Sequence, residues 1–295
     1  MPDSRILGYK KSGYHINGEG SMKIAVAGKG GTGKTLVAGG LAFLLARAGY
    51  TTIAIDADSA PNLGFLLGLS SRNAGMIVPV SKNETLIAAK TGTGYPGVYT
   101  LNFTVDDVVR KYAVPTPAGV NLLVMGTVVS MGSGCTCPAN SVIRALLRHL
   151  IVDRDEVVIM DMEAGVEHLG RGTAESVDMM LVVSDANSQS LSLAGRIAQM
   201  ARNAGIPRIA LVGNRLVDAG QDTVIREFAA ANNLEVMGMI PFDPAVVHAG
   251  IMGNSISTLE NSDALHTLNQ ILSRIERDTK GISSVILEAD KRNLS

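Results

Sequence analysis

An α/β fold, with a mostly parallel central sheet and helices on both faces, is predicted by three features of this 295-residue chain. Short apolar runs alternate along the chain with longer segments of helical character. The runs are apolar on both of their faces, as strands are when helices cover a parallel sheet on each side. A glycine-rich loop follows the first run and precedes an Ala/Leu-rich segment at 36–48, which is the order of a phosphate-binding strand–loop–helix unit.

The individual elements follow from the same patterns. The run at 51–55 is β-branched, as strands often are, and Pro138 suits the first turn of a helix. We expect strands at 24–27, 51–55, 121–125, 156–160, 178–183, 208–212 and 235–240. We expect helices at 36–48, 61–69, 84–90, 138–150, 166–176, 188–203, 222–232 and 264–277.

Composition and length limit the domain organisation and the class of partner. We find no internal repeat or linker, so a single domain is expected over 22–280, with a tail at 281–295. Residues 1–21 are polar and glycine-rich, and we expect a disordered leader or a cloning-derived tail. A net charge of −1 gives no bulk attraction to nucleic acid or to an anionic membrane. Two cysteines are too few for a disulfide framework, which favours a cytoplasmic protein.

The glycine-rich loop fits the P-loop motif of nucleotide-binding proteins. Its glycines let the backbone curl around one anion, and the helix that begins near Lys34 adds a positive dipole end. Lys34 is placed to reach the β- and γ-phosphates, and the Thr35 hydroxyl to bind Mg²⁺. The alternative is a glycine-rich turn that matches the motif by chance. The motif comprises Gly28, Lys29, Gly30, Gly31, Thr32, Gly33, Lys34 and Thr35.

A second lysine, Lys29, directly follows the first glycine of the loop. This arrangement resembles the deviant Walker A motif of the MinD/ParA/ArsA/nitrogenase iron protein group. The resemblance implies an ATPase that forms a nucleotide-dependent homodimer, in which Lys29 acts on the partner's nucleotide in the way an arginine finger does. A solvated loop lysine is the alternative interpretation.

Two acidic positions match the same group. Asp58 follows Asp56 at the end of the strand expected at 51–55, and it matches the aspartate that positions the attacking water and the water shell of Mg²⁺. Either aspartate could instead cap a helix. Asp161 and Gly165 fit the D-x-x-x-G pattern, in which the aspartate holds Mg²⁺ through water and the glycine N–H approaches the γ-phosphate.

The base-binding part of the site is expected further along the chain. Asn214 follows the strand expected at 208–212 and matches the asparagine that reads adenine in these ATPases. Pro241 and Phe242 follow the strand expected at 235–240 and match the loop that closes over the base. An asparagine at a strand end is often only a turn residue.

Cys135 and Cys137 form a C-x-C motif on a Gly/Ser-rich loop that enters a helix. Two thiols fill half the shell of a soft metal, but the same pair from each chain of a two-fold dimer supplies four sulfur ligands. Four thiolates suit Zn²⁺ or, in planar geometry, Ni²⁺. A buried pair of small apolar side chains and a redox couple are the alternatives.

The string from Asp161 to Thr173, D-M-E-A-G-V-E-H-L-G-R-G-T, together with the C-x-C motif, is similar to that of the CooC-type maturation ATPases. The similarity runs from about Met22 to the C-terminal helix. It implies an ATP-dependent homodimer that binds nickel or zinc at Cys135 and Cys137. Its client would be a nickel metalloenzyme, carbon monoxide dehydrogenase or acetyl-CoA synthase. It implies neither a nucleic-acid nor a membrane partner.

Two other functions compete with this interpretation. A MinD/ParA-type positioning ATPase should carry a basic surface or a membrane-targeting C-terminal helix, and the segment 281–295 is only weakly amphipathic. A nitrogenase iron protein-like reductase has its cluster cysteines far apart in sequence, whereas both cysteines of this chain lie in one motif.

Overall fold

The computed structural model describes residues 22–91, 109, 111–126, 145–148, 156–163, 174 and 176–293. Within these residues, eight strands form one sheet in the order β3-β4-β2-β5-β1-β6-β7-β8. Every neighbouring pair is parallel except β3 and β4. The strands are β1 (Lys23–Gly28), β2 (Thr52–Ala57), β3 (Val114–Pro115), β4 (Asn121–Val124), β5 (Val157–Met162), β6 (Met179–Ser184), β7 (Ile209–Leu216) and β8 (Glu235–Pro241).

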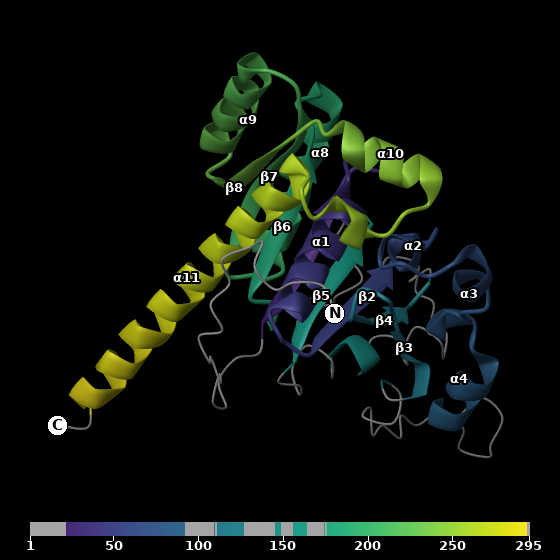
Figure 1. The fold of residues 1–295 in the computed structure, drawn as a ribbon. Coiled ribbons are helices and arrows are strands. Elements are labelled where there is room, and N and C mark those ends of the chain that lie inside the picture. Colours follow the sequence, from purple (N-terminus) through teal and green to yellow (C-terminus); the bar gives the residue numbers. More distant parts are fainter. Residues whose placement is uncertain are drawn as a thin grey trace.

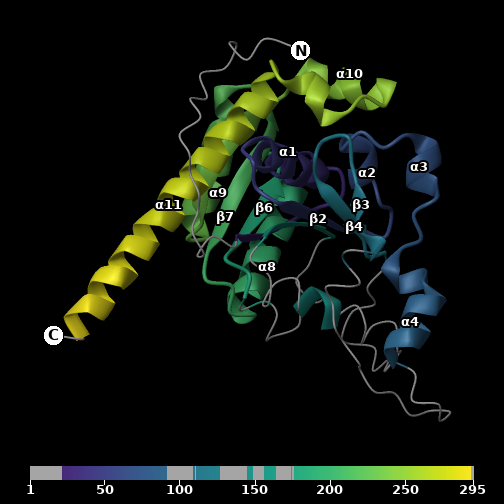
Figure 2. The same cartoon turned by 60° about the horizontal axis from the view of Figure 1, so that its bottom comes forward.

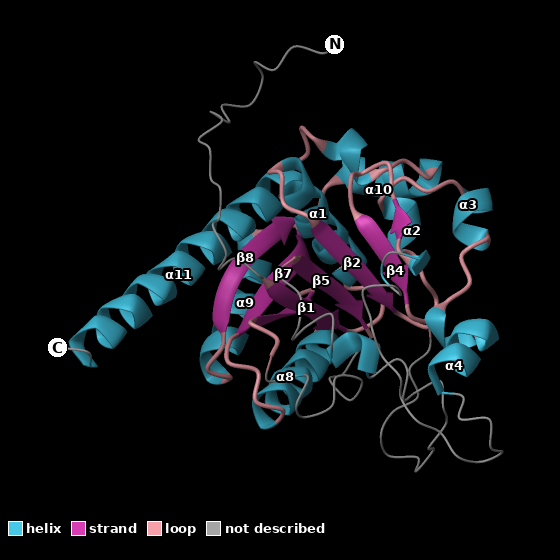
Figure 3. Cartoon of the chain, turned by 90° about the horizontal axis from the view of Figure 1, so that it is seen from below, coloured by secondary structure: helices cyan, strands magenta, loops and turns pink. Residues whose placement is uncertain are grey.

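The central strand β1 shows why the strands read as continuous apolar runs. Its side chains point alternately to the two faces of the sheet, and both faces are covered. Ile24 and Val26 belong to one buried cluster, whereas Ala25 and Ala27 belong to the other. The predicted α/β fold, with helices on both faces of a mostly parallel sheet, is confirmed (Figure 3).

The helices divide between the two faces of the sheet. Figure 2 shows α1 and α8 on opposite sides. The face of Ile24 is covered by α1 (Lys34–Arg47), α2 (Leu63–Leu66), α10 (Pro244–Met252) and α11 (Asp263–Asn293). The face of Ala25 is covered by α4 (Glu84–Thr91), α8 (Ser188–Asn203) and α9 (Ala219–Ala231). Shorter helical segments are α3 (Ser71–Gly75), η1 (Val80–Lys82) and η3 (Ile256–Leu259).

The C-terminal helix α11 is longer than the helix predicted at 264–277, because it continues through residues 281–293. It extends beyond the edge of the sheet (Figure 1). Its middle part is joined to the sheet by two ion pairs, from Asp278 to Arg208 at 2.5 Å and from Arg274 to Glu235 at 2.6 Å. Arg208 also contacts Glu235 at 2.9 Å. The division into one domain at 22–280 and flanking segments stays a prediction.

Several elements differ from the prediction in extent or were not predicted. The short antiparallel strand β3 and the helices α3 and α10 were not expected. Most of the helices predicted at 138–150 and 166–176, and all of residues 1–21, lie outside the described residues. None of the helices in the described part of the chain is long and apolar enough to cross a lipid bilayer.

Candidate functional site

The glycine-rich loop lies at the centre of the carboxyl edge of the sheet. Strand β1 ends at Gly28 between β5 and β6, and α1 begins at Lys34. Ligands bind at this edge in open α/β sheets. Helix α1 has no acidic residue in its first turn, and its N-cap residue, Gly33, makes no side-chain capping bond. The N–H groups of the first turn therefore face no competing carboxylate of their own helix, which suits a bound anion.

Glycine is required at two positions of this loop. A Cβ atom on Gly28 would lie 2.3 Å from the carbonyl oxygen of Val183 in the neighbouring strand. Gly33 has a φ of +91°, and a Cβ atom there would lie 2.1 Å from Nδ2 of Asn214. Both close approaches exclude any larger residue, and the positive φ alone favours glycine.

Hydrogen bonds fix the shape of the loop from inside and outside. The Thr32 hydroxyl donates to the carbonyl oxygen of Lys29 at 2.8 Å, and Nδ2 of Asn214 donates to the carbonyl oxygen of Thr32 at 2.7 Å. The Lys34 side chain is buried, and its Nζ donates to the Lys29 carbonyl at 3.4 Å. The carbonyl groups of Lys29 and Thr32 thus accept hydrogen bonds from side chains of the protein, which fixes their direction.

Lys29 is half-buried, and its side chain points to the start of α8 in its own chain. Its Nζ donates to Oε1 of Gln189 at 3.3 Å. A role on a partner's nucleotide requires Lys29 to break this solvent-accessible hydrogen bond, the one that its side chain donates within the described residues, and the cost in free energy is small.

Asp56, at the end of β2, is fully buried and organises the loop that follows it. Its Oδ1 accepts from the backbone N–H of Asp58 at 3.2 Å, and its Oδ2 accepts from that of Leu63 at 3.0 Å. Burial raises the pKa of Asp56, although these backbone hydrogen bonds lower it in part. This geometry agrees with the capping interpretation of Asp56 and leaves Asp58, which is half-buried, at the edge of the site.

Asp161 lies on β5, directly beside Asp56 in the strand register. It is 1% exposed, and its Oδ1 has no hydrogen-bond partner among the described residues. Burial raises the pKa of Asp161 to about 7; the Thr35 hydroxyl and the charge of Lys34 lower it, and the charge of Asp56 raises it further. A buried carboxylate oxygen without a partner is costly, and a cation or a proton stabilises it.

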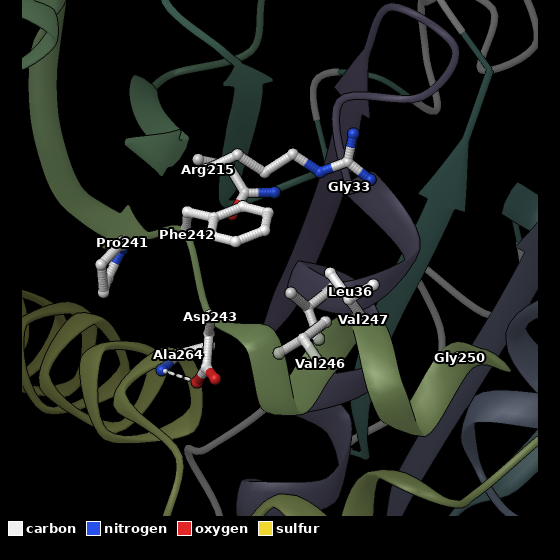
Figure 4. Close-up of a pocket in the computed structure, with 11 residues that line it drawn as sticks. Gly33, Leu36, Arg215, Pro241, Phe242, Asp243, Val246, Val247, Gly250 and Ala264 are labelled. Atoms are coloured by element: carbon white, nitrogen blue, oxygen red, sulfur yellow. Dashed lines mark hydrogen bonds between the residues drawn. The ribbon is translucent and has the colours of Figure 1, made fainter. Parts of the chain in front are cut away.

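A pocket of about 260 Å³ opens beside the glycine-rich loop (Figure 4). The predicted base-binding residues Asn214, Pro241 and Phe242 all line it, and Phe242 is 47% exposed. Arg215 also lines it, with a φ of +60°, an unusual value for a residue other than glycine. The remaining lining residues are Gly33, Leu36, Asp243, Val246, Val247, Gly250 and Ala264.

Three of the predicted site residues, Cys135, Cys137 and Gly165, lie outside the described residues. The search of the described ranges finds no group of three or more His, Cys, Asp or Glu side chains arranged to hold a metal ion. The other predicted residues, from the loop at 28–35 to Phe242, gather along one edge of the sheet.

Some contacts of this site were not predicted from the sequence. The bond from Lys29 to Gln189 joins elements 160 positions apart, and the bonds from Ser59 to Glu163 join two loops 104 positions apart. No local pattern indicates such pairs. Arg215, which also lines the pocket, was not predicted either, although its position directly after Asn214 could have indicated it.

Comparison with known proteins agrees with this geometry. Residues 23–256 match the family model described as CobQ/CobB/MinD/ParA nucleotide binding domain. The carbon monoxide dehydrogenase accessory protein CooC of Rhodospirillum rubrum is 40% identical over 89% of this chain and 100% of its own length. An ATP-binding protein of Methanocaldococcus jannaschii is 38% identical over 80% of this chain and 91% of its own length.

Solved structures show the same fold. The MinD cell division protein of Aquifex aeolicus has a TM-score of 0.61 and 19% identity, and the match covers 86% of this chain and 96% of that one. A ParA family ATPase from Chlorobium tepidum has a TM-score of 0.60 and 16% identity, covering 84% and 96%. The chain therefore belongs to the CobQ/CobB/MinD/ParA nucleotide binding domain family, and within it to the ATPases of CooC type.

Proposed function

We propose that this protein is an ATP-dependent, dimerising metallochaperone of the cytoplasm. It binds nickel or zinc at Cys135 and Cys137 and assists nickel insertion into carbon monoxide dehydrogenase or acetyl-CoA synthase. The observation that carries the proposal is the 40% identity to the carbon monoxide dehydrogenase accessory protein over that protein's whole length. The C-x-C motif adds soft ligands suited to nickel or zinc.

One nucleotide spans the glycine-rich loop and the adjoining pocket. The two are contiguous, because Gly33 belongs to the loop and also lines the pocket beside Asn214. The loop at 28–35, with Lys34 and the first turn of α1, binds the phosphates. The side chains of Asn214, Pro241 and Phe242 hold the adenine, with the exposed Phe242 ring available for stacking.

The residues beside the phosphates fit a magnesium ion, since Asp161 has a buried oxygen without a partner among the described residues and Thr35 lies against the same carboxyl group. Thr35 would bind Mg²⁺ directly, and Asp58 and Asp161 would hold it through water. When bound, Mg²⁺ neutralises charge on the phosphate oxygens. Asp58 orients the attacking water, and Gly165 approaches the γ-phosphate.

Lys29 makes hydrolysis depend on the dimer, because it acts on the nucleotide of the partner chain. Its ammonium group crosses to the nucleotide of the partner chain and stabilises the charge that develops on the transferred phosphoryl group. Closure over ATP brings Cys135 and Cys137 of both chains together, so that four thiolates surround one ion. Hydrolysis loosens this closure and releases the ion to the client enzyme.

The experiment that tests the proposal is an anaerobic nickel titration with and without ATP, in which the mass in solution is recorded. We expect one ion per two chains in the wild type and no such site in Cys135→Ala/Cys137→Ala. The matched control is Thr136→Ala, which changes the same loop and keeps both thiols. An ion bound per monomer, or a site that survives loss of both cysteines, would contradict the proposal. A brown protein with an iron–sulfur spectrum would instead indicate a reductase.

A further inference from the structure

We propose that Glu163 is a positioning residue for ATP hydrolysis, which acts by holding the loop that carries Asp58. This inference rests on the role proposed above for Asp58. Both the backbone N–H and the hydroxyl of Ser59 donate to Oε1 of Glu163, the N–H at 3.2 Å. One carboxylate oxygen thus joins the loop after β2 to the residue that follows β5.

The sheet explains why these two residues meet. Strands β2 and β5 are paired in register, with Asp56 beside Asp161 and Ala57 beside Met162. The chain continues from the last pair into Asp58 and Glu163. Glu163 is therefore two residues beyond Asp161, as Asp58 is two residues beyond Asp56. Each strand end carries one buried carboxylate followed by one more accessible carboxylate.

The loop after β2 has few other restraints near Asp58. Asp56 fixes its two ends by accepting from the N–H groups of Asp58 and Leu63. Between them, Ser59 and Ala60 are exposed, and Oδ1 of Asp58 accepts from the N–H of Ala60 at 2.9 Å. That last bond is internal to the loop and does not tie it to the sheet. The bonds to Glu163 tie the middle of the loop to a second strand.

The acceptor on Glu163 is a carboxylate oxygen, which receives both the backbone N–H and the hydroxyl of Ser59. Hydrogen bonds to a carboxylate are stronger than hydrogen bonds between neutral groups. The result is a fixed distance between the strand that carries Asp161 and the loop that carries Asp58. Misplacement of a group that orients the attacking water lowers the rate of the chemical step and has a smaller effect on the affinity for substrate.

The test is steady-state ATP hydrolysis by the full chain, without nickel or client enzyme. We expect Glu163→Ala to lower kcat about tenfold, as expected for the loss of a charge-assisted hydrogen bond, and to leave the KM for ATP within about twofold. Ser59→Ala keeps the backbone donor, so its loss in kcat should be about threefold. Because Glu163→Ala already removes the bond that Ser59→Ala breaks, the double variant should be no slower than Glu163→Ala.

Glu163→Gln keeps an acceptor oxygen and should recover most of the lost kcat. Glu227→Ala, which removes an exposed carboxylate from α9, is the matched control and should behave as the wild type. Melting temperatures of all variants separate unfolding from misplacement. Unchanged kcat in Glu163→Ala, multiplied losses in the double variant, a change confined to KM, or equal loss in Glu163→Gln would each overturn the inference.

Asp58→Ala keeps a failure of this inference apart from a failure of the proposed function. If Asp58→Ala loses hydrolysis and Glu163→Ala does not, only the role of Glu163 is wrong. If Asp58→Ala hydrolyses ATP as fast as the wild type, the proposed role of Asp58 is wrong, and the inference falls with it.

Discussion

At the scale of single residues, the buried Asp161 makes the free energy of unfolding depend on pH. Its folded pKa of about 7 lies above the ordinary value of 3.8, chiefly because of burial. The folded chain therefore binds this proton more tightly than the unfolded chain does. The stabilisation is fully present below about pH 4 and is lost as the pH rises through 7. The difference between the two pKa values corresponds to roughly 4 kcal/mol.

We expect the free energy of unfolding of the nucleotide-free protein to fall as the pH rises from about 5 to about 7.5, because folded Asp161 loses its proton in this range. Asp161→Asn should reduce this fall, because the amide does not titrate. The raised pKa values of Asp56 and Asp178 act in the same direction and account for a remainder. Urea unfolding at both pH values measures the effect, with Glu227→Gln as the exposed control. If the free energy of unfolding fell equally with pH in Asp161→Asn and in the wild type, Asp161 would not be the titrating group.

The two lysines of the glycine-rich loop should be separable by kinetics. Lys34 is buried under the loop, so Lys34→Ala should weaken ATP binding at least about tenfold, the effect of one lost charge-assisted bond. Within the described residues, the Lys29 side chain makes one hydrogen bond, to the exposed Gln189. Lys29→Ala should therefore preserve ATP binding and lower kcat by about 10³, as the loss of an arginine finger does.

Nucleotide titration and single-turnover hydrolysis distinguish the two variants. Gln189→Ala is the control for Lys29, because it releases the lysine without removing its charge, and it should keep the wild-type kcat. Weakened ATP binding in Lys29→Ala with an unchanged kcat would show that Lys29 serves its own nucleotide.

At the scale of elements, one carboxylate joins two helices beside the pocket that Phe242 lines. Oδ1 of Asp243 accepts from the N–H of Ala245 in α10 at 2.8 Å. Oδ2 accepts from the N–H of Ala264 in α11 at 3.1 Å, the bond drawn in Figure 4. The neighbouring residue is Phe242, which lines the pocket. A single cap thus fixes the starts of both helices and the direction of the loop at 241–243, which we propose to bind the base.

Asp243→Ala should lower the free energy of unfolding by about 2 kcal/mol, since two capping bonds are lost together. It should also weaken ATP binding, because the loop at 241–243 loses its attachment. Asp243→Asn keeps one acceptor oxygen and should show about half of the stability loss. Chemical unfolding and ATP titration measure both effects. Stability loss without any change in ATP affinity would show that the pocket does not depend on this cap.

The sequence predicted the elements that carry strong periodic signals. The parallel strands were predicted because they are apolar on both faces, and the C-terminal helix was predicted at 264–277 because that segment is amphipathic. Helix α10 was not expected, since residues 244–252 are apolar on all sides and show no helical period. The signal that could have located its start is Asp243 as N-cap followed by Pro244 at the first helical position.

The same difference holds for the site. The residues of the glycine-rich loop were predicted because a contiguous motif specifies them. The contacts of Ser59 with Glu163 and of Asp243 with Ala264 were not, because they depend on strand register and helix placement. A pair of residues on separate elements leaves no pattern in a single sequence. The two strand-end aspartates, Asp56 and Asp161, were expected at one edge, and the structure places them side by side.

At the scale of the whole molecule, the proposed function requires that ATP and metal favour the same dimer. Thermodynamic linkage then makes ATP raise nickel affinity by the same factor as nickel raises ATP affinity. We expect a factor between about 5 and about 150, the usual range for coupled sites. Titrations of each ligand at fixed concentrations of the other measure both factors in a hydrolysis-deficient Asp58→Ala background. No coupling in either direction would contradict a shared dimeric state.

Light scattering during these titrations provides the corresponding check on mass. The particle mass should double only when nucleotide or metal is bound, and Cys135→Ala/Cys137→Ala should still double with ATP. A mass that stays at that of one chain under all conditions would restrict the protein to a monomeric ATPase, and a mass that stays at that of two chains would contradict ligand-dependent dimerisation.

Asn214 belongs to two parts of the site at once: its amide donates to the carbonyl of Thr32, and the residue lines the pocket that we propose to bind the base. Gly33 leaves no free space between that amide and the backbone. A purine that displaces Asn214 must therefore shift the peptide after Thr32, which we propose to bind the phosphates. Adenosine alone, which carries no phosphate, should therefore alter hydrogen–deuterium exchange at residues 31–35. Binding of the base would then change the conformation of the loop beside which we propose that ATP is hydrolysed.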